Sequence, residues 1–317
     1  MPDRHGTLAV TALSRTEWTR ACARSTPVLP FTDHRWIALG LAGSPGTRFA
    51  PVALHNPDGG TTLVPLCLTP EGARVGCFGY GSLLTPGGEP DTPWPDFGPL
   101  AARLGAELGF GELRTLLPPP GVVPALDRAA ARWPHVSGPV TYLLDLSRPD
   151  PLAAARGSVR TALRRARSEG LGPVPVDTSS VLRLYRETMA RNGVPARYGP
   201  GLLDALLGAS GEPERAAADT VVTAVGRRGV AHAVAVFAVA GPTAYHIMQL
   251  TSDEGRSTNA GHLALWTAVD ALRERAVATA DLGSARSPGQ DRFKIRCGAA
   301  PVATRLVRWP FTEEGDR

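Results

Sequence analysis

The fold class is decided by the stretch Thr220-Val221-Val222-Thr223-Ala224-Val225, followed after Gly226-Arg227-Arg228-Gly229 by Ala231-His232-Ala233-Val234-Ala235-Val236-Phe237-Ala238-Val239. Both apolar runs are rich in valine and alanine, and the turn formers between them indicate a β-hairpin. A third strand is expected at Ala244–Leu250. A helix is expected at Gly261–Arg275, because Leu263, Trp266, Val269 and Leu272 recur at helical spacing.

Further elements are predicted on both sides of this stretch. Before it come a strand at Thr141–Leu146 and helices at Ala153–Glu169, Ser179–Ala190 and Pro200–Leu207, and after it a short strand at Thr279–Leu282. The first half of the chain has a helical segment at Arg15–Ala23, a hairpin pattern around residues 53–61, a helix at Leu100–Leu108 and a strand at Glu112–Leu117. Both halves therefore predict mixed α/β domains.

The order strand, helices, three antiparallel strands, helix, strand fits the acetyltransferase-like (GNAT) fold. We predict an α/β protein with two tandem GNAT-like domains, each a mixed central sheet flanked by helices. The predicted domains are residues 1–138 and 139–317, the second being catalytic. The tail after about Leu306 is expected to pack on the first domain.

Composition excludes several classes of protein. The 317 residues are 43% hydrophobic and 20% charged, as in folded globular proteins. The sequence has neither a membrane-length apolar run nor an N-terminal signal peptide, so we expect a cytoplasmic protein. The four cysteines, Cys22, Cys67, Cys77 and Cys297, show no metal-ligand spacing and are interpreted as reduced thiols. The net charge of +5 allows a polyanionic partner.

One lysine, Lys294, stands among the 34 basic residues. Arginine cannot replace lysine where a compact ammonium must fit beside a reacting atom, so the retained lysine indicates a function, with chance as the alternative. It follows the acidic, Gly- and Ser-rich segment Asp281-Leu282-Gly283-Ser284 and lies between Phe293 and Ile295. An ammonium held there can stabilise the oxyanion of an acyl-transfer intermediate. The alternative is an ordinary ion pair between Asp281 and Lys294.

Several stretches resemble the Fem (FemABX) family of aminoacyl-tRNA-dependent peptidyltransferases. They are Tyr142–Ser147 with the Arg-rich segment Val159–Arg167, Leu184–Gly193, and the Asp-Leu-Gly loop with Phe293, Lys294 and Gly298. The resemblance covers residues 140–305 and is faint before them. It implies tandem GNAT-like domains that transfer amino acids from aminoacyl-tRNA to amines, with the lysine serving the acyl-transfer step. The coiled-coil arm of many cell-wall Fem enzymes is missing from this sequence, which favours a small amine acceptor, as in specialised-metabolite or antibiotic biosynthesis.

Candidate site residues follow from these patterns. Lys294 and Asp281 are predicted to be catalytic. Predicted substrate-binding residues are Phe293, Arg197, Tyr198, Tyr245, His246, Asn259, Ser284 and Arg286. Tyr245 and His246 alternate along a strand, so one is expected to face the core and the other the site. Predicted tRNA-binding residues are Arg160, Arg164, Arg165, Arg167, Arg292 and Arg296, although a solvated helix face is the alternative for the first four.

The sequence indicates the acyl donor less clearly than it indicates the fold. Acetyl-CoA enzymes of this fold bind pyrophosphate on an Arg-x-x-Gly-x-Gly/Ala turn at a helix N-terminus, and here Asn259 replaces the first glycine of Arg256-Ser257-Thr258-Asn259-Ala260-Gly261. The missing glycine argues against CoA as the acyl donor. The alternative is that Ser257, Thr258 or Asn259 simply caps the helix. The scattered histidines give no metal site, and we expect no cofactor.

Three functions remain open. The favoured one is an aminoacyltransferase that uses aminoacyl-tRNA as donor and a small-molecule amine as acceptor, without a membrane partner. The second is an acyl-CoA-dependent N-acyltransferase of the GNAT type. The third is a non-catalytic module that binds RNA or peptide on the same fold. The oligomeric state does not follow from the sequence.

Overall fold

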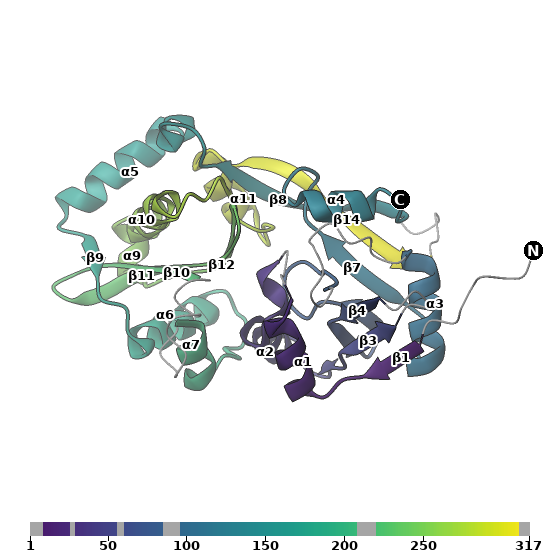
Figure 1. Cartoon of the computed structure of the whole chain (residues 1–317). Helices are drawn as coiled ribbons and strands as arrows, with labels where there is room; N and C mark the ends of the chain where they lie inside the picture. Colours follow the sequence, from purple (N-terminus) through teal and green to yellow (C-terminus); the bar gives the residue numbers. More distant parts are fainter. Residues whose placement is uncertain (1–8, 26–28, 56–59, 85–95, 208–219, 311–317) are drawn as a thin grey trace, which may run out of the picture. The chain divides into compact units, whose positions relative to one another are not determined.

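The computed structural model describes residues 9–25, 29–55, 60–84, 96–207 and 220–310. The chain divides into two compact units (Figure 1). One contains Met1–Pro139 together with Ala303–Arg317, and the other contains Val140–Val302. The strand β8 (His135–Asp145) crosses from the first unit into the second.

The first unit contains two groups of strands. Its elements are β1 (Ala9–Ala12), α1 (Arg15–Ala23), α2 (His34–Gly43), β2 (Arg48–Phe49), β3 (Val52–His55), β4 (Thr61–Val64), β5 (Leu66–Thr69), β6 (Gly72–Val75), α3 (Phe97–Leu108), β7 (Leu113–Leu117), α4 (Pro124–Ala130) and β14 (Ala300–Trp309), with a 3-10 turn at Pro30–Thr32. The order is β1-β3-β4 in one group and β2-β5-β6-β7-β14 in the other. Val52 pairs with Val64, which confirms the predicted hairpin.

The first unit contains a helix that was not predicted, and one prediction for this unit is wrong. The apolar run Trp36–Leu41 lies inside the helix α2, where Trp36, Ile37 and Leu39 are buried on the inner face. Cys67 and Cys77, interpreted as reduced thiols, form a disulfide with a Cα–Cα distance of 5.6 Å. The β5–β6 hairpin returns the chain so that two cysteines ten residues apart meet, and no short-range spacing rule reveals such a pair. Cys22 Sγ lies 3.9 Å from the Thr32 carbonyl oxygen, to which it donates, and Cys297 is a buried free thiol.

The second unit is one sheet covered by helices on both faces. Its elements after β8 are a 3-10 turn at Pro151–Ala154, α5 (Gly157–Ser168), β9 (Gly172–Val174), α6 (Thr178–Arg191), α7 (Pro200–Leu207), β10 (Thr220–Arg227), β11 (Val230–Ala240), β12 (Thr243–Thr251), α9 (Asp253–Ser257), α10 (Ala260–Glu274), β13 (Thr279–Asp281) and α11 (Pro288–Arg296). The strand order is β8-β13-β12-β11-β10-β9. Figure 1 shows α6 and α7 on one face of β10–β12, with α5 and α10 on the other.

The core of the second unit follows the predicted periodicities. Leu263, Trp266, Val269 and Leu272 of α10 pack with alternate residues of β11, namely Ala233, Ala235 and Phe237. Val159 and Leu163 of α5 join the same core. The predicted helix at Gly261–Arg275 and strand at Ala244–Leu250 are therefore confirmed within one residue at most ends.

Local geometry differs from expectation at two places. The β10–β11 turn is shorter than the predicted Gly226–Gly229, because a register shift at Val225/Gly226 extends the strands and leaves Arg228 and Gly229, both at positive φ, as the turn. The segment around Lys294, for which no element was predicted, is the helix α11. Ser287 caps its N-terminus and Pro288 occupies the first turn, which are ordinary helix-start signals.

Within the described residues, none of the helices has the length and apolar character needed to span a membrane.

Candidate functional site

The site begins where two parallel strands separate. β12 and β13 pair over Thr243↔Thr279, Ala244↔Ala280 and Tyr245↔Asp281, and β12 then continues to Thr251. Residues 246–249 of β12 are accordingly half-buried although they lie inside the sheet. The chain leaving β13 forms the loop 282–287, which leads into α11. Beyond Tyr245 no residue of β13 pairs with β12, and the loop that precedes Lys294 begins at this point.

Lys294 is held by the loop that precedes its helix. Its side chain is 8% exposed, and Nζ donates hydrogen bonds to the carbonyl oxygens of Gly283 at 2.7 Å and Ser284 at 2.8 Å. Gly283 has φ +71°, a left-handed conformation that glycine adopts without strain. The ammonium also lies 5.3 Å from the ring centroid of Tyr142. The single lysine is thus a buried cation fixed by carbonyl oxygens and an aromatic face.

The surroundings alter the acidity of Lys294. Burial, with a smaller contribution from the positive charge of Arg286, lowers its pKa to about 8, although the negative charge of Asp281 acts in the opposite direction. Lys294 therefore remains mainly protonated at neutral pH. An ammonium in a poorly hydrated site interacts strongly with a developing negative charge.

Asp281 holds the loop that positions Lys294. Its carboxylate is 2% exposed, accepts a hydrogen bond from the Thr141 hydroxyl, and accepts another from the Gly283 N–H at 2.8 Å. The hydrogen bonds of the Lys294 ammonium go to loop carbonyls. The geometry therefore gives Asp281, predicted to be catalytic, a positioning role.

The aromatic residues near Lys294 are themselves anchored. The Tyr142 hydroxyl donates to the Asp291 carboxylate of α11, and this hydrogen bond is the main reason why the pKa of Tyr142 is raised. The ring of Phe293, a predicted substrate-binding residue, lies 4.8 Å from that of His262 in the first turn of α10. Thr141, Tyr142, Asp291 and His262 were not predicted, because nothing in the sequence indicates that β8, α10 and α11 meet here.

The structure decides which of two neighbouring residues faces the site. Tyr245 is 3% exposed, and burial together with the charge of Asp281 raises its pKa. His246 is half-buried, and its pKa is lowered to about 4, first by burial and then by the positive charge of Lys294. His246 is therefore the residue on the Lys294 side, and its imidazole is neutral at physiological pH.

A second group of predicted residues lies beyond the end of α6. Tyr198 stacks on Tyr185 with ring centroids 5.0 Å apart, and the Arg197 N–H donates to the Tyr185 hydroxyl at 3.0 Å. The pKa of Tyr198 is raised mainly by burial, while the nearby charge of Arg286 lowers it. The positive charge of Arg286 also lowers the pKa of Lys294. The Ser284 and Arg286 side chains are exposed in the loop.

Asn259 has a backbone role that the sequence did not reveal. It immediately precedes α10 in the left-handed conformation, with φ 61°, and its side chain makes no capping hydrogen bond. Asparagine tolerates this conformation better than most residues. The replacement of glycine by Asn259 therefore retains a left-handed turn before α10, which weakens the sequence-based argument against CoA.

The predicted tRNA-binding arginines are exposed, and most are not beside Lys294. Arg160 donates to the Ala155 carbonyl at 2.7 Å, and Arg165 pairs with Glu169 at 2.7 Å, as residues of a solvated helix face do. Arg164 contacts the Thr161 hydroxyl at 3.3 Å, and the charge of Arg167 acts on Asp270. Arg292 and Arg296 are exposed on α11, and Arg296 lowers the pKa of His262.

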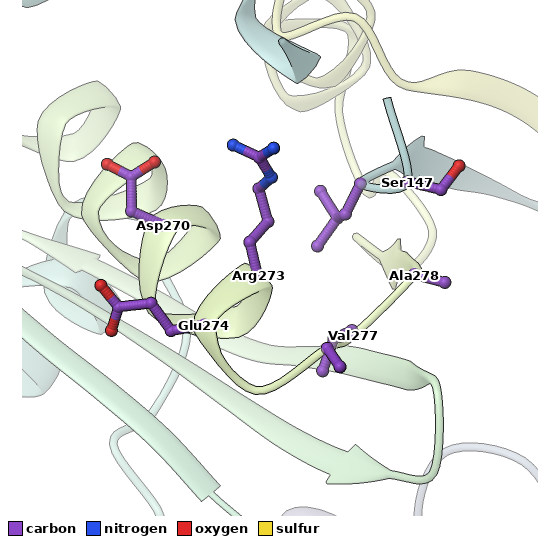
Figure 2. A pocket seen from close by; sticks show the side chains of 8 residues that line it. Ser147, Asp270, Arg273, Glu274, Val277 and Ala278 are labelled. Carbon is purple, nitrogen blue, oxygen red and sulfur yellow. The ribbon is translucent and has the colours of Figure 1, made fainter. Parts of the chain in front are cut away.

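A surface hollow in the second unit lies away from this chemistry. It is lined by Leu146, Ser147, Asp270, Arg273, Glu274, Ala276, Val277 and Ala278 (Figure 2). These residues surround the start of β13, whereas Lys294 lies beyond its end. Arg273 donates to the Pro149 carbonyl at 2.9 Å, which gives it a structural role.

Among the described residues, no cluster of histidine, cysteine and carboxylate side chains is arranged to hold a metal ion.

Comparison with known proteins supports this assignment of the fold. Residues 153–294 match the acetyltransferase (GNAT) domain family. The structure is similar to that of FemX, with a TM-score of 0.58, 12% identity, and coverage of 94% of this chain and 96% of FemX. It is also similar to L-PGS from Bacillus licheniformis, with a TM-score of 0.54, 12% identity, and coverage of 86% and 91%. A search of the curated proteins finds no significant match.

The similarity to FemX extends over nearly the whole of both chains. The predicted α/β fold of two tandem GNAT-like domains is therefore confirmed, as is the resemblance of the fold to the Fem family. At these identities the comparisons establish the fold.

Proposed function

We propose that this protein is an aminoacyltransferase that moves an amino acid from aminoacyl-tRNA to a small amine, within specialised-metabolite biosynthesis in the cytoplasm. The observation that carries the proposal is the environment of Lys294. An ammonium has three N–H donors, and the carbonyls of Gly283 and Ser284 accept two of them. Among the described residues no acceptor for the third is found. It is available to a carbonyl oxygen of the substrate.

In the proposed reaction, Lys294 donates this hydrogen bond to the carbonyl oxygen of the aminoacyl ester. The acceptor amine attacks the carbonyl carbon, and negative charge develops on the oxygen beside the ammonium. Collapse of the intermediate forms the amide and breaks the ester C–O bond. The proton lost by the amine balances the one gained by the departing ribose hydroxyl. Because the ester is already activated, positioning and electrostatic stabilisation account for the catalysis.

An acyl-CoA donor is the second candidate, and two observations favour it. The matched family is described as an acetyltransferase (GNAT) domain. In addition, the left-handed Asn259 leaves the first turn of α10 without a side-chain cap. Backbone N–H groups at such a helix start can bind a pyrophosphate. The chemistry at Lys294 would be unchanged, since a thioester carbonyl accepts the same hydrogen bond.

The donor is tested by transfer of radiolabelled amino acids from a pool of charged tRNA to a panel of small amines, with and without ribonuclease. Ribonuclease-sensitive product is the expected result. Absence of product from every charged tRNA, together with saturable CoA binding and ribonuclease-insensitive acyl transfer, would replace this proposal with the second candidate.

The pH dependence of transfer provides a separate prediction. Lys294 carries its charge below its pKa of about 8, so the charge is lost as pH rises through that value. With a hydroxylamine acceptor, whose nitrogen is already neutral at pH 7, we expect the initial rate to decline above about pH 8. Lys294→Arg should remove this alkaline decline, because arginine stays protonated. An identical decline in wild type and variant would show that Lys294 is not the titrating group.

A further inference from the structure

Two aromatic side chains lie together beside Lys294. Phe293 immediately precedes it in α11, and the Phe293 ring centroid is 4.8 Å from that of His262, in the first turn of α10, with the two rings tilted by 53°. Both side chains are only half-buried. Burial, and after it the positive charge of Arg296, lowers the pKa of His262, so the imidazole is neutral at neutral pH. Phe293 and His262 thus form an aromatic platform of uncharged, partly exposed rings, on which a nucleic-acid base can stack.

Two arginines of the same helix adjoin this platform. Arg292 and Arg296 are four residues apart, so they share one face of α11, and both are exposed. Within the described part of the chain neither forms an ion pair, and the neighbouring Asp291 carboxylate accepts the hydrogen bond of the Tyr142 hydroxyl. Arg296 suits the C-terminal end of a helix, but Arg292 lies in the middle. Like charges at this spacing destabilise a helix, so helix stability does not explain the pair.

The row of positive charge continues onto α5. The backbone N–H of Arg156 donates to the carbonyl oxygen of Arg296 at 2.9 Å, which places the start of α5 beside the end of α11 (Figure 1). Arg160 and Arg164 follow Arg156 at intervals of four residues, so the three lie along one side of the helix, and all are exposed. At a rise of about 1.5 Å per residue, these eight residues of helix span about 12 Å.

The charge of this surface has one sign. Residues 151–168 contain five arginines and no acidic residue, a charge as large as the net charge of +5 of the whole chain. A helix face that only contacts solvent commonly alternates the two signs, as Arg165 and Glu169 do on another side of α5, where they pair at 2.7 Å. The remaining arginines form a strip of positive charge that attracts a polyanion. This arginine strip consists of Arg156, Arg160, Arg164, Arg292 and Arg296.

The combination fits a single-stranded RNA end better than a free nucleotide. Proteins bind single-stranded nucleic acid with a positively charged surface that follows the backbone and with aromatic rings on which the bases stack. The nucleotide part of CoA also has a base and phosphates, but its phosphates belong to one nucleoside. The arginine strip extends from α11 over two turns of α5, and an RNA strand, with a phosphate at every nucleotide, can follow a row of that length.

We propose that the aromatic platform stacks the terminal base of an RNA 3′ end and that the arginine strip binds the phosphates of the same RNA, an assignment that rests on the proposed function. Phe293 and Lys294 are consecutive residues of one helix, so the platform and the ammonium lie within the reach of one nucleotide. The platform positions the 3′ end that carries the ester. The strip supplies affinity that does not depend on the base sequence.

The proposed surface differs from the set of arginines predicted from the sequence. Arg165 is left out, because it pairs with Glu169 away from the strip. Arg156 and His262 are added. They could not be predicted, since the contacts that bring the start of α5 and the first turn of α10 to α11 join segments distant in the sequence.

The strip is tested by binding of a hairpin RNA with a short single-stranded 3′ end, measured by fluorescence anisotropy at several salt concentrations. Arg164→Gln and Arg296→Gln should each weaken binding about 3- to 10-fold at low salt and lower the slope of log Kd against log salt by about 0.7, as loss of one single-strand phosphate contact does. Arg186→Gln is the matched control, because Arg186 is an exposed arginine of α6 on the opposite face of the sheet. An equal effect of all three variants would show that only net charge matters and would overturn the proposal.

The platform is tested by comparing this hairpin with a blunt-ended one. Phe293→Leu keeps an apolar side chain but removes the ring, so it should weaken binding of the single-stranded end about 10-fold, the effect of one lost base stack, and leave the blunt hairpin unaffected. His262→Gln, which leaves Phe293 in place, should act in the same direction. Circular dichroism checks that both variants fold. Equal losses with the two RNAs, or no loss with either, would contradict stacking.

Failure of this surface and failure of the proposed function give different results. If charged tRNA is a donor but Arg164→Gln and Phe293→Leu keep the wild-type KM for it, the surface is wrong and the function stands. If the RNA binds as expected but no charged tRNA is a substrate, the surface stands and the function is wrong. Binding of CoA without binding of RNA would assign the platform to a free nucleotide and overturn the proposal.

Discussion

Replacing Lys294 with methionine is expected to lower kcat for transfer by about 100- to 1,000-fold, the usual effect of removing one oxyanion-stabilising donor. Lys294 is buried with its ammonium over the Tyr142 ring, and a methionine, which is apolar and of similar length, fills much of the same volume. The variant should therefore fold, since it removes a charge for which burial is unfavourable. Rates under single-turnover conditions, with circular dichroism as the check on folding, measure the effect.

Two companion variants sharpen this prediction. Lys294→Arg keeps the charge but cannot place a compact ammonium between the carbonyls of Gly283 and Ser284, so partial activity is expected. Ile295→Val, in the same helix, should behave as wild type. Near-wild-type transfer by the methionine variant would exclude Lys294 from the chemistry and with it the proposed mechanism.

The sequence predicts the fold of the second unit well because its elements are long and strongly periodic. α10 carries four apolar residues at helical spacing, and β10 and β11 are nearly uninterrupted apolar runs on either side of turn formers. The helix α11 was missed because few of its residues are apolar and Lys294 is its only buried one, which leaves no amphipathic pattern to recognise. Its start signals, Ser287 and Pro288, were present.

The candidate site was only partly predictable. Lys294 and its loop were recognisable from residue type and order. The positions of Tyr142 and His262 depend on contacts between elements distant in the sequence. Local patterns do not encode such contacts. The contacts by which Asp281 anchors its loop could not be predicted for the same reason, since its partner Thr141 lies 140 residues earlier in the chain.

The variant Asp281→Leu is expected to lower the free energy of unfolding by about 2–4 kcal/mol, because it leaves buried polar partners unsatisfied. The Thr141 hydroxyl and the Gly283 N–H would both lose their acceptor, and Lys294 would lose the negative charge that favours its protonated form. Urea denaturation compared with wild type measures this loss. An unchanged midpoint would contradict the anchoring role.

Asp281→Asn separates charge from hydrogen bonding. The amide oxygen can still accept from the Gly283 N–H, so the loss of stability should be smaller than in Asp281→Leu. Because Asp281 raises the pKa of Lys294 against the effects of burial and Arg286, removing its charge should move that pKa below about 8. The alkaline decline of the transfer rate should then begin at lower pH than in wild type. If the decline stays where it is in wild type, the charge of Asp281 does not act on the Lys294 ammonium, and its role is confined to holding the loop.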